Sequence, residues 1–162
     1  MSDVSPTQRI VMLQSLGNTA GRLASTLETL GADGYEWQSQ PGEWTARQMV
    51  AHLAAAEPPF LKRLQRIVAD DNPWLPYFGP DVARPDSSQP APEALASFRA
   101  ERDRLLAFLS GLAPADWERP AVHETMGPTT MALQVQNVIN HDREHLAQLH
   151  ESSLLRAKLF HA

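Results

Sequence analysis

The 162-residue chain contains no cysteine. This absence excludes disulfides, cysteine-ligated zinc, iron–sulfur clusters and a protein thiolate as nucleophile, so any thiol chemistry must use a thiol from elsewhere. Cations are also few, because 14 Lys and Arg residues stand against 19 Asp and Glu residues, for a net charge of -5. Such a balance argues against a nucleic-acid partner, since phosphate affinity is built from clustered cations.

Long apolar runs are missing as well. No stretch approaches the roughly 18 apolar residues of a membrane span, and the amino terminus lacks a basic segment followed by an apolar run. We therefore expect a cytoplasmic protein without a membrane partner. The densest groups of cations, at 62–66 and 99–104, have Asp or Glu nearby and are interpreted as solvated helix faces.

Four segments have a helical period, and proline and glycine separate them. They cover residues 6–30, 45–71, 92–112 and 129–155, and no segment favours a strand. Ser5 with Gln8, and Thr45 with Gln48, have the spacing of capping boxes at the first two helix starts. Residues 1–162 are thus predicted to form a single all-α domain, a four-helix bundle.

The spacing within the helices predicts further detail. In the first helix, apolar and small residues recur every three or four positions and are expected to face the core: Ile10, Leu13, Gly17, Ala20, Ala24, Leu27 and Leu30. Pro58 and Pro59 predict a kink or a break in the second helix. The segment Pro73–Pro92 contains six prolines and predicts a long surface connection between helices two and three. Its length suits a lid or a contact surface and permits a crossover in the bundle.

Three histidines are candidates for chemistry. His141 and His145 are four residues apart on the apolar side of the last helix, so both imidazoles can reach one metal ion. His52, at the edge of the apolar face of the second helix, is a candidate third ligand. Three histidines leave coordination positions open, as in catalytic sites, and suit zinc, nickel, iron or copper. Histidines so spaced are also often solvated or bonded to carbonyls. The order His141-Asp142-Arg143-Glu144-His145 lacks the Glu expected of the zincin motif, so a metalloprotease is disfavoured.

Several segments together resemble a known family. Trp44-Thr45 leads to His52-Leu53 and Glu57, and later come Gly127, Thr129-Thr130-Met131 and the closing stretch HDREHLAQL at 141–149. This order is similar to that of the DinB-like (YfiT-like) family of metal-dependent enzymes, over about residues 5–155. The resemblance implies a four-helix bundle, often a homodimer. It also implies that His52, His141 and His145 bind zinc, nickel or a similar divalent ion.

The resemblance also implies an activity. Characterised relatives include transferases and isomerases that use a low-molecular-weight thiol such as bacillithiol, mycothiol or glutathione, whose pKa the metal lowers. We therefore expect transfer of such a thiol to an electrophilic small-molecule substrate, with a role in detoxification. Two alternatives stay open. One is a non-enzymatic, stress-related binding or dimer-forming bundle, and the other is a metal-dependent hydrolase, for which no residue makes a strong claim as general base.

Other polar residues carry weaker indications. Asp142 has the helical phase to orient an imidazole, and His123, expected in a loop, is a candidate for the mouth of the pocket. Glu57 lies about 140° around the helix from His52, which disfavours ligation beside it. Glu144 is expected to face solvent, and Trp44 is interpreted as a loop anchor.

Overall fold

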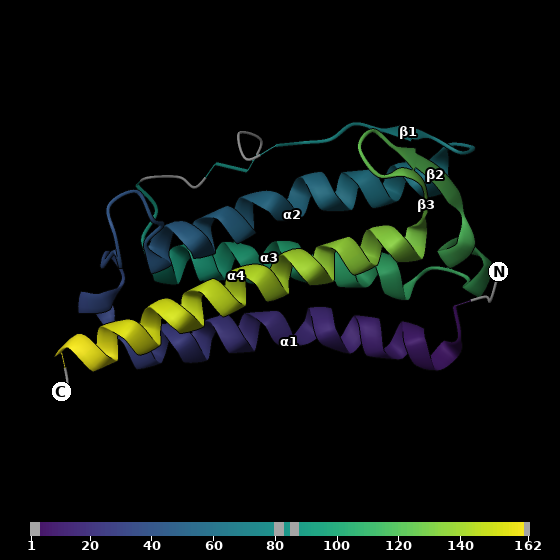
Figure 1. Cartoon of the computed structure of the whole chain (residues 1–162). Coiled ribbons are helices and arrows are strands. Elements are labelled where there is room, and N and C mark those ends of the chain that lie inside the picture. Colours follow the sequence, from purple (N-terminus) through teal and green to yellow (C-terminus); the bar gives the residue numbers. More distant parts are fainter. Residues whose placement is uncertain (1–3, 80–82, 85–87, 161–162) are drawn as a thin grey trace.

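The computed structural model describes residues 4–79, 83–84 and 88–160. Its main elements are four long helices, α1 (Pro6–Leu30), α2 (Ala46–Ala69), α3 (Ala91–Ser110) and α4 (Met131–Phe160), which form a four-helix bundle (Figure 1). The short connecting helices are η1 (Ala32–Gly34) and η2 (Pro114–Glu118). No helix among the described residues is both long and apolar enough to cross a membrane.

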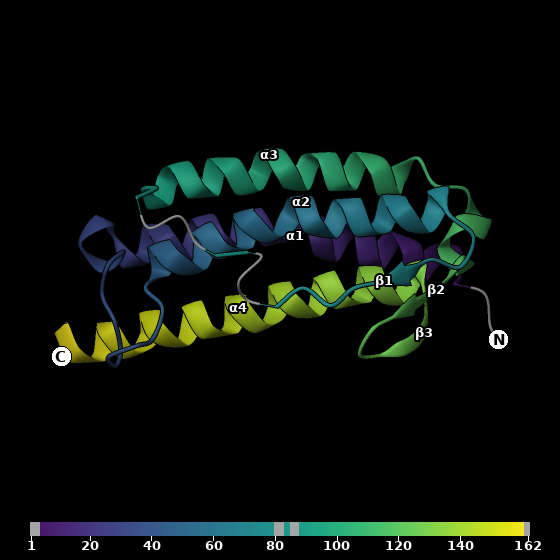
Figure 2. The same cartoon turned by 90° about the horizontal axis from the view of Figure 1, so that it is seen from above.

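The helices do not follow a simple up-and-down path. α1 packs on α3 and α4, and α2 packs on the same two helices, so that α1 and α2 lie diagonally across the bundle. α2 and α3 run in the same direction, and the connection between them returns along the length of the bundle (Figure 2). The long proline-rich segment therefore makes the crossover that its length permits.

Helix starts follow the capping chemistry of the sequence. The side chains of Ser5 and Thr45 accept hydrogen bonds from the backbone N–H groups of Gln8 and Gln48, and the two glutamine side chains accept the reciprocal bonds. Of the kink or break predicted at Pro58 and Pro59, the break is wrong, because α2 is a single helix from Ala46 to Ala69 with both prolines inside it. Proline at these positions removes two intrahelical donors without ending the helix.

The core has two apolar clusters, one towards each end of the bundle. In α1 the inward face differs from the prediction. Leu27 and Leu30 are buried as expected, but Ile10 is 55% exposed and the buried positions upstream are Leu16, Thr19 and Leu23. The inward face therefore includes polar Thr19, which an apolar-only pattern passes over.

A buried ion network separates the two apolar clusters. It takes one residue from each helix, Thr19, Glu57, Arg102 and Asp142. Thr19, Arg102 and Asp142 lie between the parts of their helices that belong to the two clusters, and Glu57 follows that boundary on α2 by one turn or less. The interpretation of residues 99–104 as a solvated face is thus wrong for Arg102, which is 1% exposed. Its charge is tolerated in the core because carboxylates accompany it.

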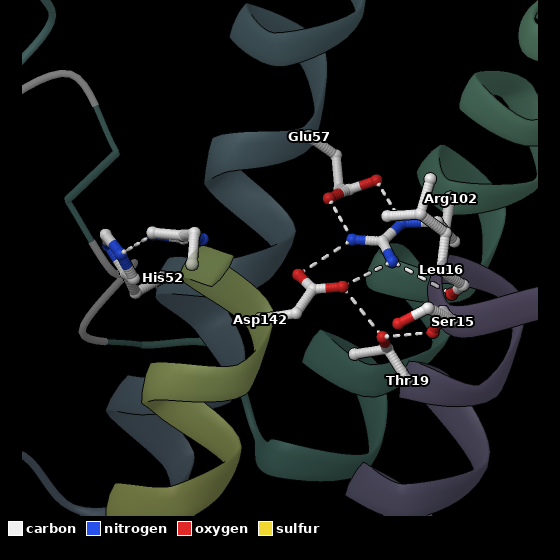
Figure 3. Close-up of polar contacts among 8 residues, drawn as sticks. Ser15, Leu16, Thr19, His52, Glu57, Arg102 and Asp142 are labelled. Atoms are coloured by element: carbon white, nitrogen blue, oxygen red, sulfur yellow. Dashed lines mark hydrogen bonds and ion pairs between the residues drawn. The ribbon is translucent and has the colours of Figure 1, made fainter. Parts of the chain in front are cut away.

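Every donor of Arg102 is used in this network. Its guanidinium lies between the carboxylates of Glu57 and Asp142 at 2.7–3.0 Å and also donates to the carbonyl of Leu16 at 2.9 Å (Figure 3). The Thr19 hydroxyl donates to Asp142 at 2.7 Å. Burial disfavours the charge of Arg102, but these two carboxylates outweigh burial and hold its pKa above the ordinary value. The four helices are thereby fixed in register at the level of the network.

The structure also contains a small sheet, although no strand is expected from the sequence. β1 (Trp74–Leu75) pairs in parallel with β2 (Pro120–His123), which forms an antiparallel hairpin with β3 (Gly127–Thr130). These strands are short and contain proline, so alternation of apolar residues does not reveal them. The sheet lies at the end of the bundle where α2 ends and α4 begins (Figure 1).

Candidate metal centre

The three predicted histidines come together between α2 and α4. His52, His141 and His145 each offer a ring nitrogen, and these atoms lie within 4.8 Å of one another. The Nε2 atoms of His52 and His141 are 3.0 Å apart. Ligands of a tetrahedral zinc ion at 2.0–2.1 Å are about 3.4 Å from each other, so the cluster has nearly the dimensions of a metal site.

Hydrogen bonds fix the orientation of two of the rings. His52 donates from Nδ1 to the carbonyl of Ala83 at 2.7 Å, and His145 donates from Nδ1 to Oε1 of Gln148 at 2.9 Å. An oxygen acceptor places the proton on Nδ1 and leaves Nε2 with a lone pair for a metal. The two contacts therefore select the ligand-competent tautomer of both residues.

His141 has an unsatisfied nitrogen. Its Nδ1 is buried and has no hydrogen-bond partner among the described residues. Leaving a buried polar atom unpaired costs about 1–3 kcal/mol, and such a cost in a well-packed protein points to a functional position. The ring lies in contact with the other two imidazoles and with Phe60, at centroid distances of 4.6 to 5.2 Å.

Burial favours the neutral form of His141 and His52. It lowers the pKa of His141 to about 3, with further lowering by His145, His52 and Arg102. Burial also lowers the pKa of His52, and the hydrogen bond to Ala83 only partly opposes this shift. Neutral imidazoles are the form that binds metal, so protons do not compete for these two rings near neutral pH. The donor set fits a divalent ion of the zinc or nickel type.

The histidines form one end of a pocket of about 560 Å³. Apolar side chains from α2, including Ala56 and Phe60, line it, together with Tyr77, Phe78 and Ala83 of the α2–α3 connection. The described residues of the connection thus form part of the pocket wall, and a role as a lid or contact surface stays a prediction. Residues 80–82 and 85–87 of the predicted connection lie outside the described residues.

A second pocket, of about 580 Å³, lies on the other side of Trp44. Trp44 and His145 line both pockets, and their rings stack at a centroid distance of 6.0 Å and an angle of 15°. The other lining residues of this pocket include Glu43, Gln148 and Glu151. His145 therefore borders both cavities, whereas His52 and His141 line only the first.

The two secondary candidates have different surroundings. The carboxylate of Asp142 binds Arg102 and Thr19 in the ion network, and Figure 3 shows His52 apart from that network. Asp142 thus anchors α4 from the core side, and none of the hydrogen bonds described for it reaches an imidazole. His123 is on β2, is 4% exposed and lines the histidine pocket, where its Nδ1 accepts from the backbone N–H of Thr125 at 3.2 Å.

Other contributors to the site are not expected from the sequence. Trp44 packs against His52 and His145 instead of acting only as a loop anchor. Glu144 is exposed as predicted, yet it also lines the pocket. Gln148, three residues after His145, could have been found from helical spacing, whereas no sequence pattern identifies the Ala83 carbonyl. Glu57 lies in the ion network rather than with the histidines, as its helical phase predicts.

Fold and site together define a four-helix bundle with a three-histidine cluster open to a pocket. Residues 16–149 match the model of the DinB superfamily, and the chain belongs to that family. Two proteins of Oceanobacillus iheyensis are similar in sequence, named "Putative metal-dependent hydrolase OB0413" and "Putative metal-dependent hydrolase OB0782". The first is 23% identical to this chain, and the match covers 85% of this chain and 80% of the relative. The second is 28% identical, and the match covers 84% of this chain and 79% of the relative.

The fold is similar to that of a solved structure. YfiT from Bacillus subtilis, described as "a probable metal-dependent hydrolase with an unusual four-helix bundle topology", superposes with a TM-score of 0.81 and 21% sequence identity. The match covers 97% of this chain and 92% of YfiT. At this identity the likeness shows the fold alone.

Proposed function

We propose that the protein is a divalent-metal-dependent enzyme in which His52, His141 and His145 hold a zinc or nickel ion. The observation that carries the proposal is the convergence of three imidazoles at a pocket of about 560 Å³, one of them with a buried nitrogen that has no partner among the described residues. In a non-enzymatic bundle, each of the three rings is expected to donate to its own carbonyl. Nδ1 of His141 has no such partner in the described part of the chain.

The reaction we propose is transfer of a low-molecular-weight thiol, such as bacillithiol, mycothiol or glutathione, to an electrophilic small molecule. A divalent ion in the site would lower the pKa of the thiol. The thiol sulfur bonds to the electrophilic carbon, the leaving group departs with its electron pair, and the thiol proton goes to solvent. The two cavities that meet at Trp44 and His145 support a reaction of two organic substrates, with one cavity for each.

Metal-dependent hydrolysis is the second candidate, favoured by the names of the similar proteins. Hydrolysis needs one organic substrate, water and a base, and Glu144 is the carboxylate that lines the histidine pocket. A homodimer, implied by the family resemblance, stays a prediction that sedimentation velocity can test.

The first experiment measures metal by mass spectrometry on untagged protein, in the native chain and in the double variant His141→Ala and His145→Ala. We expect near-stoichiometric metal in the native chain and its loss in the variant. Metal-loaded protein is then incubated with an aryl halide and each thiol, and with a p-nitrophenyl ester without thiol. Thiol-dependent release of halide supports transfer, thiol-independent release of nitrophenol supports hydrolysis, and full activity of the double variant would contradict both.

A further inference from the structure

One cation lies in the histidine pocket, outside the candidate metal ligands. Arg63 lines the pocket and belongs to α2, eleven residues after His52. Eleven residues are close to three full helical turns, so both side chains leave the same face of α2, about 16 Å apart along its axis. Ala56 and Phe60, which lie between them on this face, also line the pocket. The pocket therefore extends along α2 from the histidines to a guanidinium.

The guanidinium is held in place by the α2–α3 connection. Nη2 of Arg63 donates to the carbonyl of Pro76 at 2.7 Å, and the guanidinium carbon lies 3.9 Å from the centroid of the Phe78 ring. These contacts engage one N–H group and one face of the planar group. Because an arginine has five N–H donors, others are left for a ligand, and the immobilised side chain loses little entropy when it binds one.

Arg63 has no counter-ion among the described residues. No acidic side chain forms an ion pair with it in the part of the chain that the structure describes. Burial lowers the pKa of Arg63 to about 10, so the group stays charged at neutral pH in a partly desolvated position. Arg102, by contrast, is buried in the core with two carboxylates. A half-buried guanidinium without a carboxylate favours an anion supplied by a ligand.

The acidic side chain that lines the pocket, Glu144, lies beside the histidines in the sequence and not beside Arg63. Glu144 immediately precedes His145 in α4 and lines the pocket with it. His123 also lines the pocket. Burial lowers the pKa of His123, the charge of Arg63 lowers it further, and the charge of Glu124 partly opposes the shift. Along α2 the pocket therefore runs from the Arg63 guanidinium past the apolar side chains of Ala56 and Phe60 to the histidines, and Asn137 and Asn140 of α4 also line it.

We infer that the pocket binds an elongated organic carboxylate. The reacting group lies at the histidines, the apolar middle runs along Ala56 and Phe60, and the carboxylate binds Arg63. The inference rests on the proposed metal site for the position of the reacting end, and it adds the substrate class and a residue that determines specificity. Arg63 acts through binding of the carboxylate and takes no part in the chemical step.

The test uses probes with a hydroxamate, a group that chelates zinc, at one end. Monohydroxamic acids of succinic, adipic and suberic acid carry a carboxylate at the other end, and the straight-chain hydroxamic acids with four, six and eight carbons end in a methyl group. Binding of both series to the zinc-loaded full chain is measured by isothermal titration calorimetry. At the best-fitting length we expect the carboxylate to tighten binding at least about 10-fold, the usual effect of one charge-assisted hydrogen bond.

Two variants assign that preference to Arg63. Arg63→Gln removes the charge and is expected to abolish the preference for the carboxylate while leaving the affinity for the methyl-ended probe unchanged, which also shows that the pocket is intact. Lys62→Gln is the matched control, because it removes one cation from the adjacent, solvent-exposed position and is expected to keep the preference.

The outcomes separate this inference from the proposed function. Equal affinity for carboxylate and methyl ends at all three lengths overturns the inference and leaves the metal site standing. A preference that survives in Arg63→Gln, or that is lost equally in Lys62→Gln, also overturns it. Failure of every hydroxamate to bind zinc-loaded protein contradicts the proposed function itself, since the metal would then be closed to the pocket.

Discussion

Two polar clusters lie close together in this bundle and differ in how fully their atoms are paired. In the ion network, all five donors of Arg102 have acceptors and both carboxylates are engaged. In the histidine cluster, two imidazole nitrogens face each other at 3.0 Å and Nδ1 of His141 has no partner in the described part of the chain. A network whose polar atoms are all hydrogen-bonded stabilises the fold, whereas polar atoms without a partner are available to bind a ligand.

Adjacent residues of α4 contribute to the two clusters. Asp142 points into the ion network, whereas His141 and His145 line the pocket. On α2, His52 and Glu57 are divided in the same way. The network thus holds α2 and α4 at a fixed spacing and rotation, and that fixed geometry brings the imidazoles to within 4.8 Å. We expect variants in the ion network to change stability, and variants in the histidine cluster to change metal binding.

The largest effect is expected from Arg102→Met. The variant leaves the carboxylates of Glu57 and Asp142 buried without a cation, and breaking a buried pair in this way costs about 3–5 kcal/mol. Urea unfolding followed by circular dichroism measures the loss. The control Arg104→Met removes a side chain that is 69% exposed and should stay within about 0.5 kcal/mol of the native protein. A loss below 1 kcal/mol for Arg102→Met would mean that the network does not stabilise the bundle.

His141→Ala should act on ligand binding instead. Zinc at 100 times its dissociation constant stabilises a folded protein by about 2.7 kcal/mol. We expect this zinc-dependent rise in the melting temperature to vanish in His141→Ala, while the metal-free melting temperature changes little because an unpaired buried nitrogen is removed. His150→Ala, at an exposed position of the same helix, should keep the zinc response. The same response in His141→Ala would exclude this residue as a ligand.

Gln148→Ala tests the group that orients His145. Loss of the acceptor for Nδ1 should weaken zinc binding by about 10-fold, the lower end of the usual effect of such partners. Competition with a chromogenic chelator measures the affinity, and urea unfolding of the metal-free protein should be unchanged. Gln65→Ala, an exposed glutamine of α2, is the control. Equal zinc affinity in the two variants would show that Gln148 does not orient the ligand.

The smallest effect is expected from Thr19→Val. It removes the hydroxyl that donates to Asp142 at 2.7 Å and should cost about 1 kcal/mol of unfolding free energy, with zinc affinity unchanged. Thr29→Val, in an exposed part of the same helix, should cost less than about 0.5 kcal/mol. If Thr19→Val cost more binding free energy for zinc than unfolding free energy, the ion network and the histidine cluster would not act independently.

The sequence by itself determined the helices, their starts and the histidines that meet. Capping boxes at Ser5 and Thr45 and a helical period are local properties, because the groups that satisfy a helix start lie within one turn of it. His141 and His145 share a face for the same reason. Local patterns were least informative where polar residues turn inward: the apolar spacing missed Thr19 in α1, and the grouping of charges at 99–104 wrongly indicated a solvated Arg102.

Only the tertiary structure decided which polar residues are satisfied. The partners of Arg102 come from three other helices, and the acceptor for His52 is a backbone carbonyl 31 residues away. The sheet pairs β1 with a strand more than 40 residues later, and Arg63 joins the histidine pocket because the α2–α3 connection folds back over α2. Such contacts depend on how packing brings distant segments together, and the spacing of residues along the chain does not predict this.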